Sequence, residues 1–171
     1  LLDLRREETR LWKQLWSLDE YISKRVKVKP LTELMVLKDV DRSLLESFQS
    51  VKWTVEDLTQ DGKSVEALRL VEEFLRDEVS SGYLTREGRR LDSKDEAAWY
   101  TMWIVSLGIL KVLSPIVPNL AEEFYQQYFR DREGSPSVHT VPWPEPFAAE
   151  QPRKPVPKPS KKSRTGAVLR T

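Results

Sequence analysis

Apolar residues recur along this chain at three- and four-residue intervals, the spacing of a helix face, and no β-hairpin signal interrupts them. The first stripe predicts a helix over residues 3–24 and consists of Leu4, Leu11, Leu15, Leu18 and Ile22, widened by Trp12 and Trp16. A second stripe covers residues 44–58, with Asp39 or Asp41 expected to cap its start. A third helix is expected over residues 64–83 or beyond, although Gly82 weakens its last turn.

Two further helices complete the pattern. Ser93 and Glu96 have the spacing of a capping box, and the segment from there to residue 113 is apolar on most sides, which is typical of a central, buried helix. Pro115 ends that helix, and a fifth helix over residues 118–130 opens on a proline. Helical spacing also places four tryptophans in the core: Trp12, Trp16, Trp99 and Trp103.

After residue 130 the helical periodicity stops. Residues 131–147 are expected to form an irregular strap over the bundle, anchored by Trp143, and residues 148–171 are rich in proline and lysine and are expected to be disordered. The fold predicted is therefore an all-α antiparallel bundle of about five helices. It comprises one helical domain over residues 1–147, followed by the tail over residues 148–171.

The amino-acid composition excludes several kinds of catalytic and metal-binding site. The chain has no cysteine and one histidine, His139, so a disulfide, a thiolate metal site or a two-histidine zinc site is excluded, and a catalytic triad is implausible. We expect His139 to be a structural loop residue. No apolar run approaches the roughly 20 residues that span a bilayer. The net charge of +1 conceals an acidic body and a tail with seven Lys or Arg and one acid.

Four short motifs occur in a fixed order along residues 1–147. They are Asp41-Arg42, the run Phe74–Tyr83 followed by arginines, the junction Pro115–Tyr125, and Ser137-Val138-His139 with Trp143-Pro144. Together they resemble the anticodon-binding domain of class I aminoacyl-tRNA synthetases for isoleucine, valine and leucine, and the isoleucine enzymes most of all. Gly82 stands where that pattern usually has tryptophan, and Val79 where it has leucine.

The resemblance implies recognition of the tRNA anticodon stem and loop by the C-terminal part of a cytoplasmic isoleucine–tRNA ligase. Isoleucine tRNA and the catalytic domain of the parent enzyme would be its partners, with no membrane involved. The class's two-histidine signature and its Lys-Met-Ser-Lys-Ser loop are both missing, and we attribute the echo at residues 158–163 to chance. We therefore expect no catalytic residue, metal or cofactor in this chain, ATP being bound elsewhere in the parent. The alternatives are a valyl or leucyl enzyme, or a non-catalytic protein-interaction bundle derived from a synthetase.

Candidate RNA contacts begin with Arg86, Arg89 and Arg90, because a helix places the first and last of these on one face. The alternative is a solvated helix end whose cations lie near the negative pole of the helix. Arg76 either contacts RNA or pairs with Glu72 or Glu73. Trp53 is a candidate for base stacking. The basic tail could add diffuse affinity through Lys161 and Lys162 together with Arg153, Lys154, Lys158 and Arg164, whereas the cations at residues 24–29 fit a solvated loop better.

Overall fold

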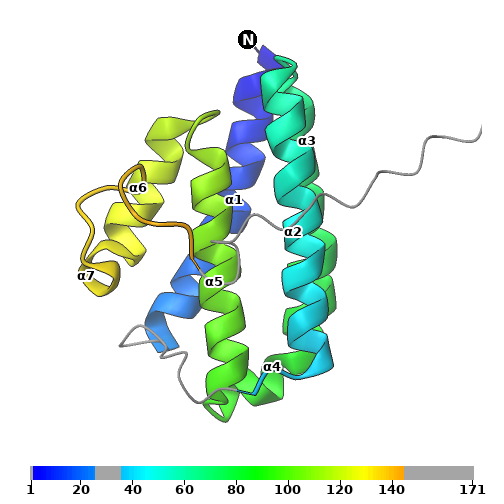
Figure 1. The fold of residues 1–171 in the computed structure, drawn as a ribbon, viewed down its shortest axis with the longest axis vertical. Helices are drawn as coiled ribbons and strands as arrows, with labels where there is room; N and C mark the ends of the chain where they lie inside the picture. The colour runs from blue at the N-terminus through cyan, green and yellow to red at the C-terminus, as the bar shows by residue number, and fades with distance from the viewer. Residues whose placement is uncertain (1, 26–35, 145–171) are drawn as a thin grey trace, which may run out of the picture.

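The computed structural model describes residues 2–25 and 36–144, and this part of the chain contains helices and no strand. The elements are α1 (Leu2–Arg25), α2 (Asp39–Gln60), α3 (Ser64–Glu73), the π-helix η1 (Phe74–Leu84), α4 (Thr85–Asp92), α5 (Glu96–Leu113), α6 (Pro118–Tyr128) and α7 (Arg130–Glu133). The long helices lie side by side, and successive ones run in opposite directions (Figure 1). The predicted all-α fold is confirmed.

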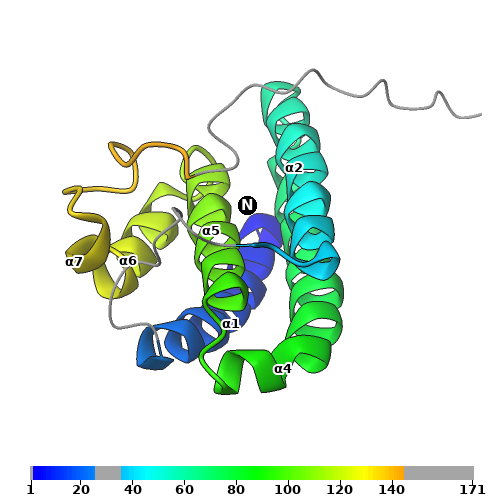
Figure 2. The same ribbon diagram turned by 60° about the horizontal axis from the view of Figure 1, so that its bottom comes forward.

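The third predicted helix is longer and less regular than its pattern indicated. It runs without a break through α3, η1 and α4, so it continues past Tyr83 to Asp92. The η1 segment is wound more widely than an α-helix, and the Thr85 hydroxyl donates a hydrogen bond to the Ser80 carbonyl five residues earlier (3.0 Å). Such widened turns often mark functional sites. Helix α4 then crosses the end of the bundle towards the start of α5 (Figure 2).

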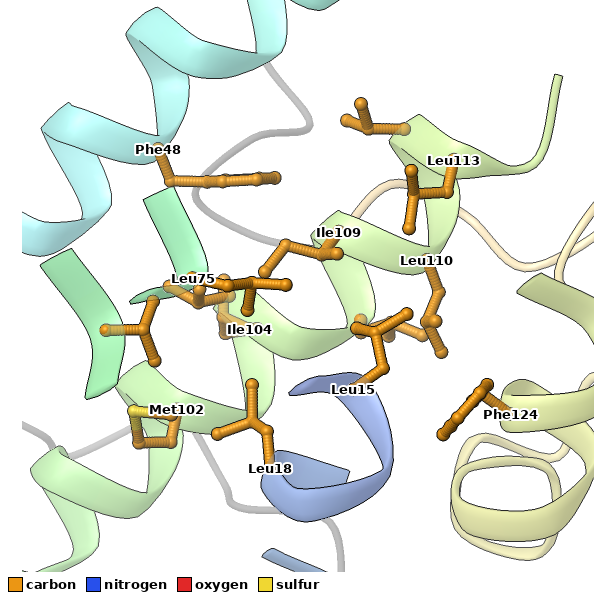
Figure 3. Packing of buried hydrophobic residues seen from close by; sticks show 14 of the residues in the cluster. Leu15, Leu18, Phe48, Leu75, Met102, Ile104, Ile109, Leu110, Leu113 and Phe124 are labelled. Carbon is orange, nitrogen blue, oxygen red and sulfur yellow. The ribbon is translucent and has the colours of Figure 1, made fainter. Parts of the chain in front are cut away.

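Helix α5 is the centre of the core, as its all-round apolar sequence predicted. Ile104, Ile109 and Leu110 project from α5 among Leu15 of α1, Phe48 of α2, Leu75 of η1 and Phe124 of α6 (Figure 3). By length and hydropathy alone α5 could cross a membrane, despite its interrupting polar residues. However, 89% of it is buried inside the protein, which is the environment of a core helix.

The predicted cap of α5 is wrong. Asp95, not Ser93, is the N-cap, and its carboxylate accepts a hydrogen bond from the Ala98 amide (3.0 Å). Ser93 instead closes α4, where its hydroxyl donates to the Arg90 carbonyl (2.9 Å). Lys94 takes a left-handed conformation between the two helices (φ 63°). Ser93 and Lys94 therefore belong to the turn between α4 and α5, and the predicted capping box does not form.

The four tryptophans predicted for the core divide into two pairs. Trp99 and Trp103 on α5 are buried, as predicted, whereas the core prediction is wrong for Trp12 and Trp16, which are 40% and 42% exposed. The two exposed rings stack on each other along α1 with centroids 6.3 Å apart. They widen the apolar stripe of α1 beyond the width that the neighbouring helices cover.

The strap after α6 lies over the bundle, as predicted, but it is held by several groups and not by Trp143 alone. Val138, Val141 and Pro144 are buried, while Trp143 is half-buried beneath the Lys52 ammonium, 4.3 Å from its ring centroid. Lys111 of α5 donates hydrogen bonds to the carbonyls of Val138 (3.2 Å) and Val141 (2.8 Å). Burial lowers the pKa of Lys111. The predicted disordered tail lies outside the described residues.

One buried acid has no compensating contact. Asp19 of α1 is 1% exposed, and neither of its carboxylate oxygens has a hydrogen-bond partner within the described part of the chain. Burial raises its pKa well above the ordinary aspartate value. This carboxyl therefore opposes the folded state once it is ionised.

Candidate nucleic-acid interface

The candidate arginines lie at one end of the bundle, which we call the α4 end and define as residues 38–42 and 78–96. It comprises the first turn of α2, the last turns of η1, all of α4 and the turn into α5 (Figure 2). It carries six Lys or Arg and seven Asp or Glu. Because the two signs nearly balance, any polyanion binding here depends on which cations are exposed rather than on a strongly basic field.

A network of polar side chains organises the α4 end, and Asp41 is at its centre. Asp41 is fully buried and accepts hydrogen bonds from the Tyr83 hydroxyl (2.6 Å) and from both terminal nitrogens of Arg90 (2.9 and 3.0 Å). Arg90 also donates to Asp95 (3.1 and 3.0 Å) and to Glu87 (2.8 Å). This hub, Asp41–Tyr83–Arg90–Asp95, joins α2, η1, α4 and the start of α5.

The charges in the hub stabilise one another. Burial alone would raise the pKa of Asp41, but hydrogen bonds from Arg90, Tyr83 and the Lys38 amide outweigh it, so that pKa is lowered. The hydrogen bond from Arg90 similarly lowers the pKa of Asp95. Burial and the neighbouring Asp41 raise the pKa of Tyr83, and the Asp41 carboxylate raises that of Arg90. All four groups thus keep their ordinary charge states at neutral pH.

The placement of Arg90 argues against a direct contact with RNA. Its side chain is only 14% exposed, and three carboxylates occupy its donors. Removing it from this arrangement to meet a phosphate would leave Asp41 buried and unpaired. Arg90 therefore positions the α4 end, and the predicted shared face of Arg86 and Arg90 does not form an exposed pair.

Arg86 and Arg89 are exposed, as an interface requires. Arg86 donates from Nε to the Gly82 carbonyl (3.1 Å), which fixes the base of its guanidinium but leaves its terminal nitrogens unpaired within the described residues. The Arg89 side chain forms no hydrogen bond or ion pair with any described residue. These two side chains are the cations of α4 that remain available for phosphate.

The other candidates are not gathered at this end. Arg76 is exposed but pairs with Asp77 (2.9 and 3.1 Å) and with Glu72 (3.5 Å), the pairing alternative that the sequence left open. Trp53 is half-buried, ten residues and about 15 Å along α2 beyond Ser43, which lies near Arg86. Lys161 and Lys162 lie outside the described residues and stay predictions. His139 is exposed in the strap, where its amide donates to the Ser137 hydroxyl (3.2 Å).

A small hollow opens beside the exposed arginines. It has a volume of about 260 Å³ and is lined by Asp39, Val40, Ser43, Leu44, Glu78, Tyr83 and Arg86. The sequence patterns gave no sign of it, because it arises where α2 meets η1. In the described residues no three His, Asp or Glu lie together as a metal site would require.

The sequence reading missed the role of Asp41. The Asp41-Arg42 motif lies in the first turn of α2, as predicted, and the Asp41 carboxylate accepts a hydrogen bond from the Lys38 amide there (2.9 Å). The structure also joins this aspartate to Tyr83 and Arg90. The motifs Asp41-Arg42 and Phe74–Tyr83 are both visible in the sequence. The hydrogen bond between Tyr83 and Asp41, 42 residues apart, depends on the packing of the bundle and leaves no local sequence signal.

Comparison with known proteins agrees with this architecture. Residues 41–165 match a family model described as the anticodon-binding domain of tRNA ligase. The chain is 30% identical to the isoleucine–tRNA ligase of Pyrococcus furiosus over 76% of its length, and 32% identical to that of Thermococcus kodakarensis over 70%. It is 26% identical to the valine–tRNA ligase of Thermococcus kodakarensis over 79%. It spans 12% of the two isoleucine enzymes and 16% of the valine enzyme.

Proposed function

Because the chain belongs to the family of anticodon-binding domains of tRNA ligases, we propose that it binds the anticodon stem and loop of isoleucine tRNA. The family match carries this proposal, since it includes α4 with its two exposed arginines and the hub that positions them. The isoleucine choice follows the identities of 30% and 32% to isoleucine–tRNA ligases, against 26% to the valine enzyme.

Binding of the stem-loop has two parts, contacts to the RNA backbone and contacts to its bases. Arg86 and Arg89 neutralise phosphates of the stem, a contribution that is blind to sequence and weakens with salt. Loop bases, once unstacked, are read by stacking and by hydrogen bonds to their edges. The hub takes no part in contact with RNA, but it fixes α4 across the end of the bundle so that both guanidiniums face outward.

The parent protein under this proposal is a cytoplasmic, ATP-dependent isoleucine–tRNA ligase. The domain described here holds the tRNA, while the amino acid, ATP and the tRNA acceptor end meet in a catalytic domain elsewhere in the parent. The basic tail, with Lys161 and Lys162, adds diffuse attraction to the same polyanion.

Titration with labelled anticodon stem-loops of isoleucine and valine tRNA at several salt concentrations tests the proposal. We expect micromolar binding that weakens steeply with salt and favours the isoleucine stem-loop. Equal affinity for the two stem-loops would move the assignment to the wider family. Absence of binding at low salt, with an intact helical circular dichroism spectrum, would contradict it.

A protein-interaction role is the second candidate, and one observation favours it. Trp12 and Trp16 form an exposed stacked pair on α1, and a hollow of about 270 Å³ lies between Trp12 and the start of α6. Exposed aromatic residues beside a hollow are typical of protein-binding surfaces. If this role replaced RNA binding, Trp12→Ala would abolish a pull-down of the protein's partner and the stem-loop titration would show no binding.

A further inference from the structure

The exposed face of α1 carries an aromatic surface that is already held in place. Among the described residues, Trp12 and Trp16 are the only exposed aromatic side chains. Their rings are nearly parallel, and the ring of Phe124 on α6 packs edge-on against Trp12 with centroids 6.2 Å apart. Because these contacts fix the tryptophan pair, a group that docks on it costs little side-chain entropy.

The hollow next to the tryptophan pair is acidic. It is lined by six residues of α1 and α6: Glu8, Thr9, Trp12, Asn119, Leu120 and Glu123. The side chains of Glu8 and Glu123 form no hydrogen bond or ion pair with any described residue, and no Lys or Arg of the described chain lines the hollow. An indole ring between two such carboxylates favours a partner that is apolar along its length and positively charged, and it repels an acidic one.

The chain itself contains a segment of this chemistry, residues 152–162. The sequence there is Pro-Arg-Lys-Pro-Val-Pro-Lys-Pro-Ser-Lys-Lys, with four prolines, five cations and no acid. Such a composition favours the polyproline II helix, whose three-residue turn places Pro152, Pro155 and Lys158 on one face. Proline-rich segments of this kind dock in aromatic-lined grooves, because their conformation is largely set before binding.

The connection to this segment is long enough to reach the acidic hollow. Trp143, near the end of the described chain, lies 5.7 Å from the Lys111 ammonium at the end of α5. Lys111 precedes Asn119 by eight residues, so their backbones are at most about 28 Å apart. The chain from Trp143 to Lys158 spans up to about 50 Å when extended, which exceeds that separation and the length of the intervening side chains.

We propose that residues 152–162 dock on the tryptophan pair, with prolines against the indole rings and Lys or Arg side chains opposite Glu8 and Glu123. The docking is intramolecular, so the effective concentration of the segment offsets a weak contact. The inference goes beyond the proposed function and gives the pair an occupant within the chain, where the second candidate function needs a separate protein. RNA and the acidic hollow then compete for the cations of the tail.

A spin label in the tail of the full chain tests the docking without RNA. Because the chain has no cysteine, Ser160→Cys provides a single labelling site, and each of the six tryptophans gives one indole N–H signal in ¹⁵N-labelled protein. With millimolar effective concentration and a millimolar contact, the label should reduce the signals of Trp12 and Trp16 by at least about half at low salt. The signals of Trp53 and Trp99 should lose less.

Two pairs of substitutions test the charges. Glu8→Gln with Glu123→Gln should remove the selective loss, whereas the control Glu46→Gln with Glu66→Gln changes the net charge equally at exposed sites and should preserve it. Salt at about 1 M should weaken the loss in the unsubstituted hollow, because the screening length falls to about 3 Å. Circular dichroism checks the folding of both variants.

The same contact can be broken from the side of the tail. Lys154→Glu with Lys158→Glu in the spin-labelled chain should also abolish the selective loss, and these positions lie outside the described bundle. This variant decides the question if the substitutions in the hollow disturb folding.

Three results would overturn the docking. The first is an equal loss, or no loss, at all six indole signals. The second is a selective loss that persists in both the hollow and the tail variants. The third is a selective loss in a mixture of ¹⁵N-labelled chain without the spin label and spin-labelled chain without ¹⁵N, which would show that the tail docks on a second copy. Each leaves the proposed function intact, because stem-loop binding is measured separately.

Discussion

Two regions of α4 that adjoin in sequence differ completely in environment. Arg90 lies in the hub, 14% exposed and bound to three carboxylates, whereas Arg86 and Arg89 lie on the outer surface without a carboxylate partner among the described residues. Residue type and helical spacing are the same in both regions. The difference is the partner across the bundle, because α2 and the turn into α5 place Asp41 and Asp95 against only one of the three.

The largest effect should follow from breaking the hub. Arg90→Ala leaves Asp41 buried and uncompensated, so it should lower the free energy of unfolding by about 3–5 kcal/mol. Arg89→Ala is the matched control and should change it by less than about 0.5 kcal/mol. Urea unfolding followed by circular dichroism measures both. A stable Arg90→Ala protein that had lost only RNA binding would reverse the assignment.

The tryptophan pairs provide the same comparison in apolar residues. Trp103→Ala on α5 should destabilise the protein by about 3–5 kcal/mol, because it empties a buried site and removes the hydrogen bond to Glu133 (2.6 Å). Trp12→Ala should cost about 1 kcal/mol, since that ring is 40% exposed. Equal losses in thermal unfolding would show that a further element covers α1.

Acid should weaken the hub first. Because the pKa of Asp41 is lowered by its partners, its contribution is fully present above the ordinary value of 3.8 and is lost as pH falls through the lower folded value. As pH falls below 3.8, stability should therefore fall more steeply in the wild-type protein than in Asp41→Asn. Parallel curves would show that Asp41 does not govern acid unfolding.

Asp19 should have the opposite dependence, with a smaller effect confined to α1. Its pKa is raised by burial, so it disfavours folding increasingly as pH rises above 3.8 through the folded value. Asp19→Asn should therefore raise the melting temperature at neutral pH and leave it nearly unchanged in acid. A loss of stability at neutral pH would indicate a partner for this carboxylate.

The sequence predicted the fold far better than the site, for a physical reason. Helix positions follow from local periodicity and prolines. Pro118 was therefore enough to predict the start of α6, and the apolar residues of α5 were enough to predict a buried central helix. The exposure of a helix residue depends on how much of the helix surface its neighbours cover. Periodicity does not give that width, so Trp12 and Trp16 were wrongly predicted to be buried. The sequence could not indicate that Arg90 is buried, because its partner Asp41 lies 49 residues away, and the hollow forms only where α2 meets η1.

The central claim is that the outer face of α4 contacts the tRNA backbone. The most direct measurement is the salt dependence of stem-loop binding for the wild-type protein, Arg86→Ala, Arg89→Ala and the double variant, each checked for unchanged unfolding. Each substitution should reduce the slope of log affinity against log salt by about 1. A slope that is unchanged in the double variant would contradict the account.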